Sequence, residues 1–243
     1  MGWFFKKKKA VDLQYIKTDI HSHMLPGIDD GASSMAESVH LIKQMRDLGY
    51  KKMIITPHVR FGSFDNDTAE FESRLRDVVY ALQESGIEME LEVGAEQTID
   101  EGFKEHFRNG ELKHFGRNKY LLIEFPFNML PMNIKDTVFD LQSAGYSLIL
   151  AHPERYLYLR EQKDMIDYLH DSNVLFQLNI LSLTGFYDKA TRNFARWLIK
   201  QDYIDLVGTD LHHQKHLDGV KKALTDKYLH KLVDCDRLMN SMF

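Results

Sequence analysis

The sequence predicts an α/β fold in which seven strand-and-helix units form one distorted (β/α)7 barrel, and three observations support this. From Lys17 onward, short apolar runs alternate with longer helical patterns, which is typical of β/α units with a largely parallel sheet. Seven such units in 243 residues suit a compact barrel better than an open sheet with a second domain. No linker rich in proline, glycine or serine divides the chain, so we expect a single barrel domain over residues 17–243 after a flexible basic tail over residues 1–16.

The expected strands are short apolar runs, and the expected helices between them repeat apolar residues with the helical period. The strands are expected at residues 17–23, 51–58, 87–97, 120–126, 147–152, 175–180 and 204–212. The helices are expected at residues 33–48, 66–84, 135–144, 163–171, 189–200 and 219–233. The polar stretch 100–118 contains three glycines and no clear period, so we expect a loop or short helices there.

Several helix boundaries have recognisable chemistry. Ser33 or Ser34 is suited to cap the first helix, and Glu37 is placed to return a capping-box bond. Glycines follow the first, second and third expected helices, where the chain must turn into the next strand: Gly49, Gly86 and Gly145.

Six of the seven expected strands end in, or lead directly to, a histidine or carboxylate. In a barrel of parallel strands the carboxyl ends share one face, where catalytic groups gather. His21 and His23 lie two residues apart in a strand, which puts both imidazoles on one side. The candidate metal ligands are His21, His23, Asp30, His58, Glu96, Glu124, His152, Asp210 and His212.

Each of these residues also has an ordinary structural interpretation. Glu96 and Glu124 could form salt bridges, His152 could be a hydrogen-bonded core histidine, and Asp210 could belong to a turn. The whole set is harder to explain in this way, because its members fall at corresponding places in successive units. The remaining seven histidines fall in expected helices or loops and are expected at the surface.

Nitrogen and oxygen ligands without thiolates suit manganese, iron or zinc. Nine ligands are too many for one ion, but with shared carboxylates they suit two or three divalent cations. Three such ions outweigh the four carboxylates by about two charges, so the site would attract phosphate. Metals also lower the pKa of bound water and stabilise charge on phosphoryl oxygens, which predicts a phosphoester hydrolase.

Composition argues against several other classes of protein. The net charge of −5 disfavours a nucleic-acid binder, which usually has a basic face. The single cysteine, Cys235, forms no intrachain disulfide and lacks the arginine spacing of a cysteine-nucleophile phosphatase. No stretch is long and apolar enough to span a bilayer, and the first ten residues have the wrong order for a secretory signal. A cytoplasmic location is therefore expected.

The first ten residues permit two interpretations. The simpler is a solvated, flexible tail. The other is weak attachment to an anionic membrane surface through Trp3, Phe4, Phe5 and the lysines at 6–9.

The strand-end residues resemble the four motifs of the PHP superfamily (polymerase and histidinol phosphatase). More closely, DIHSHMLPGIDDGA, ITPH, GAEQ, LIEFP, LAHPERY and GTDLH resemble the bacterial protein tyrosine phosphatases of capsule and exopolysaccharide loci. The similarity extends from Thr18 to His212. It implies a TIM-like barrel of the PHP type that holds three metal ions, often manganese, with iron, zinc or magnesium as alternatives.

The resemblance also implies roles for individual residues. His21, His23 and Asp210 would hold one ion, and Glu96 would bridge it to a second. The second ion would be completed by Glu124 and His152, and the third would be held by Asp30, His58 and His212. Arg155 would bind the substrate phosphate as a bidentate fork, so that Arg155, Asp210 and His152 would be the catalytic residues.

The implied reaction is attack by a metal-bridging hydroxide on phosphotyrosine, without a covalent intermediate. The implied substrate is the tail of a membrane-bound tyrosine kinase that controls polysaccharide assembly. One motif departs from the family, which often has an asparagine and then a phosphate-binding arginine after its D-x-H. Here no arginine follows His212 closely, and Lys215, His216 or Arg60 is the candidate replacement.

Three alternatives stay open at this point. A histidinol-phosphate phosphatase or a nuclease would share the barrel and the metals. A regulatory module that retains metals without turnover belongs to another class, and a membrane-associated scaffold would depend on the tail alone.

Overall fold

Parallel strands surrounded by helices make up residues 10–243, which are the part of the chain that this computed structural model describes. One sheet has the order β1 (Thr18–Asp19), β2 (Lys52–Ile55), β4 (Glu90–Val93). The other has the order β3 (His58–Val59), β5 (Glu96–Thr98), β6 (Tyr120–Glu124), β7 (Ser147–Ala151), β8 (Leu175–Asn179), β9 (Leu206–Gly208). Every pairing between these strands is parallel, as expected.

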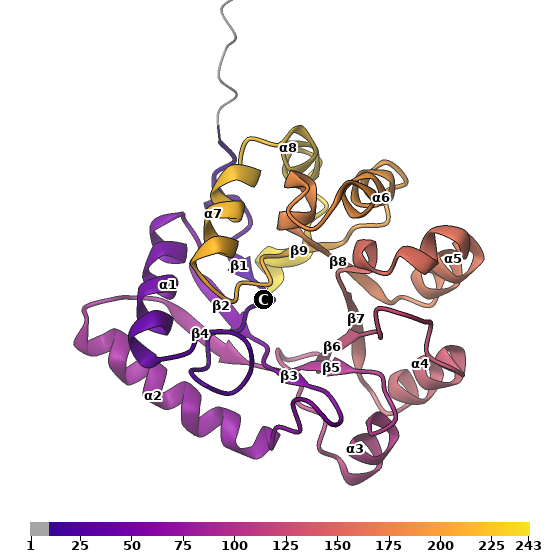
Figure 1. Cartoon of the computed structure of the whole chain (residues 1–243), viewed down its shortest axis with the longest axis horizontal. Coiled ribbons are helices and arrows are strands. Elements are labelled where there is room, and N and C mark those ends of the chain that lie inside the picture. The colour runs from indigo at the N-terminus through magenta and orange to yellow at the C-terminus, as the bar shows by residue number, and fades with distance from the viewer. Residues whose placement is uncertain (1–9) are drawn as a thin grey trace, which may run out of the picture.

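The two sheets form a single circuit. The expected strands 51–58 and 87–97 are each broken in two, so that β2 continues into β3 and β4 into β5. Pro57 has no N–H to give to a sheet, and at Gly94 a Cβ would lie 2.5 Å from the Phe115 ring. The last strand returns to the first, because the Asp210 N–H donates to the His21 carbonyl at 2.9 Å. The predicted distorted barrel is therefore confirmed (Figure 1).

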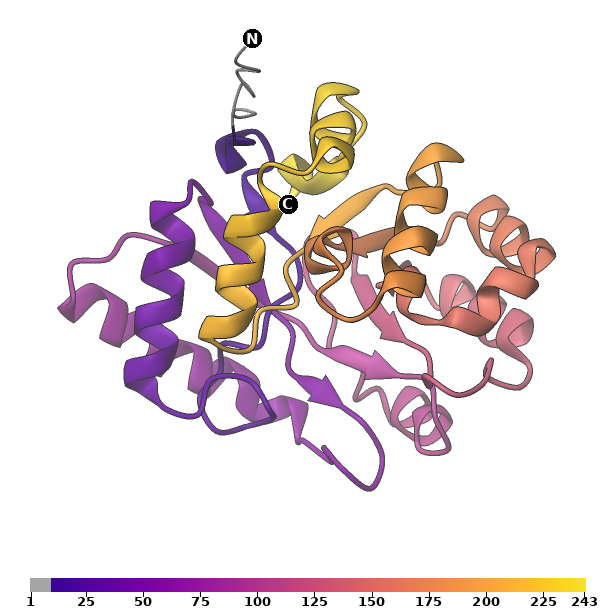
Figure 2. The ribbon, with the colours of Figure 1, turned by 45° about the horizontal axis from the view of Figure 1, so that its top comes forward.

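The helices lie outside the strands, with α1 and α2 on one side of the barrel and α4, α5 and α6 on the other (Figure 2). Their bounds are α1 (Met35–Asp47), α2 (Phe71–Glu84), α3 (Phe103–Asn109), α4 (Ile134–Ser143), α5 (Lys163–Asp171), α6 (Lys189–Lys200), α7 (Gln214–Ala223) and α8 (Lys227–Asp234). Short 3-10 turns occupy Leu13–Tyr15, Thr68–Glu70, Pro153–Arg155, Leu157–Glu161, Ile180–Thr184 and Met239–Met242.

Two expectations about the helices need correction or refinement. The prediction of a single helix at 219–233 is wrong, because α7 ends at Ala223 and a separate helix, α8, follows. The Asp226 carboxylate accepts the Tyr228 N–H and caps the start of α8. The capping box of α1 is divided between the two serines. Ser34 accepts the Glu37 N–H, whereas the Glu37 carboxylate accepts from Ser33.

The interior of the barrel is apolar below the candidate site. Ile54, Leu122, Ile149 and Leu206 come from four strands, and they pack into one buried cluster with Ile20, which directly follows β1. Because side chains alternate along a strand, a residue two positions after one of these points to the same side. Glu124 follows Leu122 in this way, so β6 carries its carboxylate inward at the end of the strand.

The boundary of the tail differs from the expectation. Residues 11–16 pack on the barrel, because Leu13 and Ile16 are buried and the Val11 N–H donates to the Leu224 carbonyl at 2.8 Å. The aromatic and lysine residues at 3–9 lie outside the described residues. Within residues 10–243, no helix has both the length and the apolar character needed to cross a membrane.

Asn240, near the C-terminus, joins the last strand to the first. It is buried, its side chain accepts from the Val207 N–H at 3.0 Å, and its amide donates to the Val207 and Thr18 carbonyls at 2.7 and 2.9 Å. We expect Asn240→Ala to lower the free energy of unfolding by about 1–3 kcal/mol, because buried backbone groups lose their partners. Urea denaturation measures this, with exposed Asn193→Ala as the control. Equal losses in the two variants would contradict the role.

Candidate metal centre

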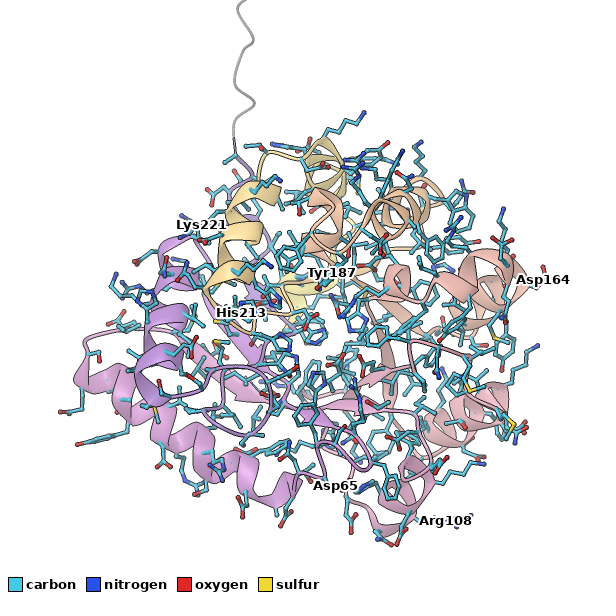
Figure 3. The ribbon with its side chains drawn as sticks, in the orientation of Figure 1. Asp65, Arg108, Asp164, Tyr187, His213 and Lys221 are labelled. Carbon is cyan, nitrogen blue, oxygen red and sulfur yellow. The ribbon has the colours of Figure 1, made fainter. Side chains whose placement is uncertain are left out.

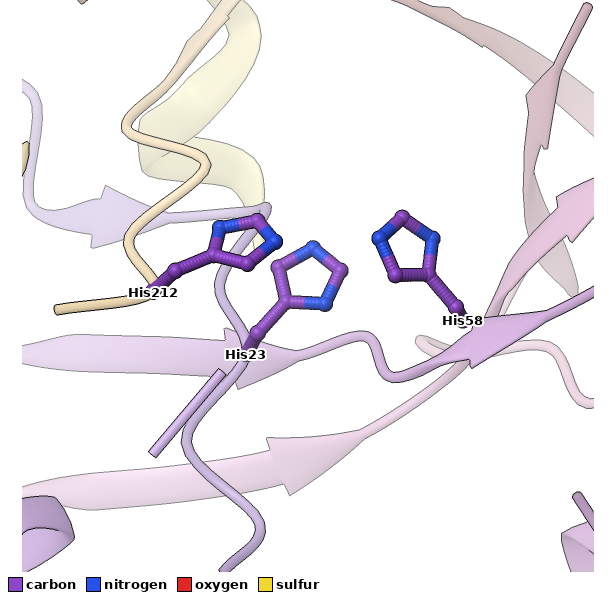
Figure 4. Close-up of side chains that lie close together, drawn as sticks. All are labelled: His23, His58 and His212. Carbon is purple, nitrogen blue, oxygen red and sulfur yellow. The ribbon is translucent and has the colours of Figure 1, made fainter. Parts of the chain in front are cut away.

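The structure brings the nine candidate ligands together at the carboxyl ends of the strands. Eight of them are buried, and the Asp30 side chain is 61% exposed at the rim. Asp30 Oδ1 lies 3.4 Å from Nε2 of both His58 and His212. Side-chain atoms within 4.8 Å of one another define four overlapping groups: His23/His58/His212, His21/His23/Glu96, His21/His152/Asp210 and His58/Glu96/Glu124. Figure 4 shows the first of them, with imidazoles from three segments that are far apart in the sequence.

Each oxygen of the Glu96 carboxylate lies close to different histidines of the cluster. Its Oε1 is 2.9 Å from His152 Nε2, and its Oε2 is 2.9 Å from His58 Nδ1 and 3.3 Å from His21 Nε2. Within residues 10–243, Oε2 is buried and makes no directed hydrogen bond. Such an orphaned anionic oxygen among imidazole nitrogens fits a site for cations.

Asp210 divides its two carboxylate oxygens between different partners. Oδ1 lies 3.4–3.5 Å from nitrogens of His21, His23 and His212. Oδ2 instead accepts from Arg155 at 3.0 Å and from Asn179 at 2.9 Å. One oxygen therefore faces the histidine cluster, while the other is fixed by side chains beside it.

The backbone at two of the candidate ligands is left-handed. The φ angle is +33° at His152 and +50° at Asp210, which is uncommon for residues other than glycine. His152 comes directly after β7, and Asp210 comes two residues after β9. Such strain is typical of functional sites.

The charges in the cluster stabilise one another. Burial lowers the pKa of His21, but the Glu96 and Asp210 carboxylates outweigh burial and raise this pKa to about 10. Burial raises the pKa of those two carboxyls, yet the neighbouring histidines hold it well below its usual range. A metal ion bound by His21 would therefore displace a proton.

Comparison with known proteins decides the family. A family model described as capsular polysaccharide synthesis, CpsB/CapC, matches residues 17–237, a span that contains all nine candidate ligands. The chain belongs to the CpsB/CapC family.

Relatives of this CpsB/CapC protein are named as tyrosine phosphatases. Tyrosine-protein phosphatase YwqE of Bacillus subtilis is 30% identical over 197 residues, which are 81% of this chain and 78% of that protein. Putative tyrosine-protein phosphatase CapC of Staphylococcus aureus is 29% identical, over 80% of this chain and 76% of that protein. A chain from the crystal structures of YwqE and Streptococcus pneumoniae CpsB, described as metal-dependent tyrosine phosphatases, matches with a TM-score of 0.79. Its identity is 28%, over 89% of this chain and 90% of that chain.

Sequence reasoning missed the residues that orient the candidate ligands of this CpsB/CapC chain. Gln177 Oε1 lies 2.8 Å from His21 Nδ1, and Asp29 Oδ2 lies 2.8 Å from His23 Nδ1. Such partners fix the ring orientation and tautomer of a ligating histidine. Gln177 and Asn179 come from β8, which corresponds to the one expected strand without an expected ligand. Their spacing of two was the signal that could have found them.

Both predicted phosphate-binding arginines reach the cluster. Arg155 donates to Asp210, while Arg60 donates to Glu124 and, at 3.3 Å, to the Thr98 hydroxyl. The other two candidates to replace the family's arginine, Lys215 and His216, make different contacts. Lys215 lies over the Phe186 ring at 5.3 Å, and His216 Nδ1 is 3.0 Å from the Asp210 carbonyl. Figure 3 shows Tyr187 and His213 near the centre of this face, whereas Arg108 and Asp164 lie at its edge.

Proposed function

We propose that this CpsB/CapC protein is a metal-dependent protein tyrosine phosphatase that hydrolyses phosphotyrosine monoesters. The observation that carries the proposal is the buried cluster around Glu96, with Arg155 beside it. Family membership and the tyrosine phosphatases among the relatives support the choice of substrate. The alternatives, a histidinol-phosphate phosphatase or a nuclease, have no comparable support at this identity and coverage.

The proposed centre holds three divalent cations, with manganese the first candidate and iron, zinc or magnesium the others. His21, His23 and Asp210 would hold one ion, Glu124 and His152 a second, and Asp30, His58 and His212 a third, with Glu96 shared between the first two. Close approaches within each set support the assignment. His21 and His23 lie near Asp210, and His152 lies near Glu96 and Glu124. Asp30 lies near His58 and His212. The bound ions would activate water and offset charge on the phosphoryl oxygens.

The protein's own side chains bind and orient the substrate. Arg155 would take the phosphate through charge-assisted hydrogen bonds, and Arg60 would supply a second cationic group. Gln177 and Asp29 keep His21 and His23 in one orientation, which presents their other nitrogens to the cluster. Tyrosine, with a pKa of about 10, is a fair leaving group and needs little acid assistance.

The proposed partner is a phosphotyrosine protein, in particular the tail of a membrane-bound tyrosine kinase that controls polysaccharide assembly. The net charge of −5 disfavours nucleic acid as a substrate. We also predict that the protein acts in the cytoplasm and that residues 1–10 make a weak contact with a membrane surface. Deletion of residues 1–10, followed by measurement of liposome binding, tests the latter.

Removal of metal should abolish turnover. We expect protein treated with a chelator to leave a phosphotyrosine peptide intact, and added manganese to restore hydrolysis. A phosphoserine peptide, histidinol phosphate and an oligonucleotide serve as competing substrates. Preference for one of these, or turnover that survives the chelator, would contradict the proposal. Bound metal without any turnover would favour the regulatory module.

Metal should also stabilise the fold. A ligand that binds only the folded state adds about 2.7 kcal/mol at a concentration one hundred times its dissociation constant. We therefore expect manganese to raise the melting temperature of the metal-free protein by several degrees. Glu96→Gln removes the central carboxylate and should lose most of this rise. A rise of equal size in both proteins would mean that the metal binds elsewhere.

A further inference from the structure

The Arg155 guanidinium lies over two aromatic rings. Its central carbon is 4.6 Å from the centroid of the Phe127 ring and 4.5 Å from that of the Tyr187 ring. Phe127 follows β6 and Tyr187 precedes α6, so two different loops supply the rings. Cations attract the faces of aromatic rings, and guanidinium groups also stack on them.

This arrangement leaves the edge of the guanidinium for ligands. The N–H groups of a guanidinium lie in its plane, and ring faces do not compete for them. One of them donates to Asp210, which is the only hydrogen-bond partner of the Arg155 guanidinium among residues 10–243. The other N–H groups stay available to a phosphate.

Other contacts hold the two rings in place. Asn179 donates to the Tyr187 hydroxyl at 2.8 Å and also to Asp210. The Phe127 ring stacks near His152, with centroids 5.9 Å apart and an angle of 19° between the planes. Both rings are thereby tied to candidate ligands of the metal centre.

Phe127 is also open to solvent. Its residue is 43% exposed, which is unusual for a phenylalanine packed beside an arginine and a histidine. An apolar ring at the edge of a phosphate-binding site suits a substrate with an aromatic group next to its phosphate.

We propose that Phe127 and Tyr187 form an aromatic clamp that holds the Arg155 guanidinium in one plane, and that the open part of Phe127 packs against the phenyl ring of the substrate. Phe127 is then the residue that favours aryl over alkyl phosphate monoesters. The proposal rests on the proposed phosphatase function. A phosphoserine side chain has no ring and gains nothing from Phe127.

Binding of two inert analogues to manganese-loaded protein tests the clamp without turnover. Phenylphosphonate carries the ring, and methylphosphonate does not. Calorimetric titration should show about tenfold tighter binding of phenylphosphonate to the unmodified protein. Phe127→Leu should bring that ratio close to one. Tyr187→Leu should weaken both analogues alike, by about three- to tenfold, because Arg155 loses one of its rings.

Two further variants keep the test specific. Tyr187→Phe retains the ring and should bind both analogues within about threefold of the unmodified protein. Phe139→Leu, a 69% exposed position on α4, should change nothing. Metal content and circular dichroism confirm that each variant is folded and loaded.

The outcomes separate the parts of the proposal. An unchanged ratio in Phe127→Leu would overturn the packing of the substrate ring. Unchanged affinity for both analogues in Tyr187→Leu would overturn the clamp. If the unmodified protein hydrolyses no phosphotyrosine peptide, the proposed function fails, but these titrations still decide the role of the two rings.

Discussion

His152→Ala is expected to lower kcat/KM for a phosphotyrosine peptide by at least about a thousandfold, since a metal centre contributes several kcal/mol to stabilising the transition state. His152 Nε2 lies 2.9 Å from Glu96 Oε1 and 3.7 Å from Glu124 Oε1, so its loss removes a proposed ligand of the second ion. Steady-state kinetics, metal content and circular dichroism give the result.

The matched control for this variant is His40→Ala, an exposed histidine on α1. It should keep its turnover within about twofold, as expected for surface substitutions. Retained hydrolysis of an aryl phosphate by a folded His152→Ala protein would count against the metal centre.

Arg155→Lys is expected to lower kcat/KM by about a hundred- to a thousandfold, the usual effect of removing one group that stabilises developing charge. Lysine retains the positive charge but cannot form a planar fork or stack on two rings in the same way. In contrast to His152→Ala, this variant should retain its full complement of metal. Kinetics and metal analysis on the same preparation separate the two effects.

Arg108→Lys on α3 is the control for Arg155→Lys, because Arg108 is exposed and lies at the edge of the molecule (Figure 3). It should leave activity unchanged. An Arg155→Lys protein as active as this control would exclude Arg155 from binding the phosphate.

Much of the barrel and the positions of the candidate ligands could be predicted because both depend on short-range patterns. An apolar run followed by a histidine or carboxylate identifies a strand and its carboxyl end together, as at Glu124 and His152. Asp30 was expected with this group from the loop after the first strand, and it lies at the exposed rim near His58 and His212.

The breaks in the strands and the partners of the ligands could not be predicted with the same ease. The break at Gly94 is next to Phe115, which is 21 positions later in the chain and packs where a Cβ would lie. Gln177 and Asn179 are amides in an apolar strand, and their importance depends on where β8 lies relative to His21 and Asp210. These contacts join residues that are far apart in the sequence, so no local pattern predicts them.

The packing of residues 11–16 on the barrel could not be predicted for a similar reason. Val11, Leu13 and Ile16 are too few to form a recognisable period, so residues 11–16 resembled an extension of the lysine-rich start. Their burial depends on contacts with the far end of the chain, such as that between Val11 and Leu224.

Anomalous diffraction from crystals grown with manganese tests the central claim most directly. We predict three peaks enclosed by the nine candidate ligands, with Glu96 between two of them and Asp30 beside the third. Empty density among these side chains at saturating manganese, or peaks only at surface carboxylates, would contradict the account.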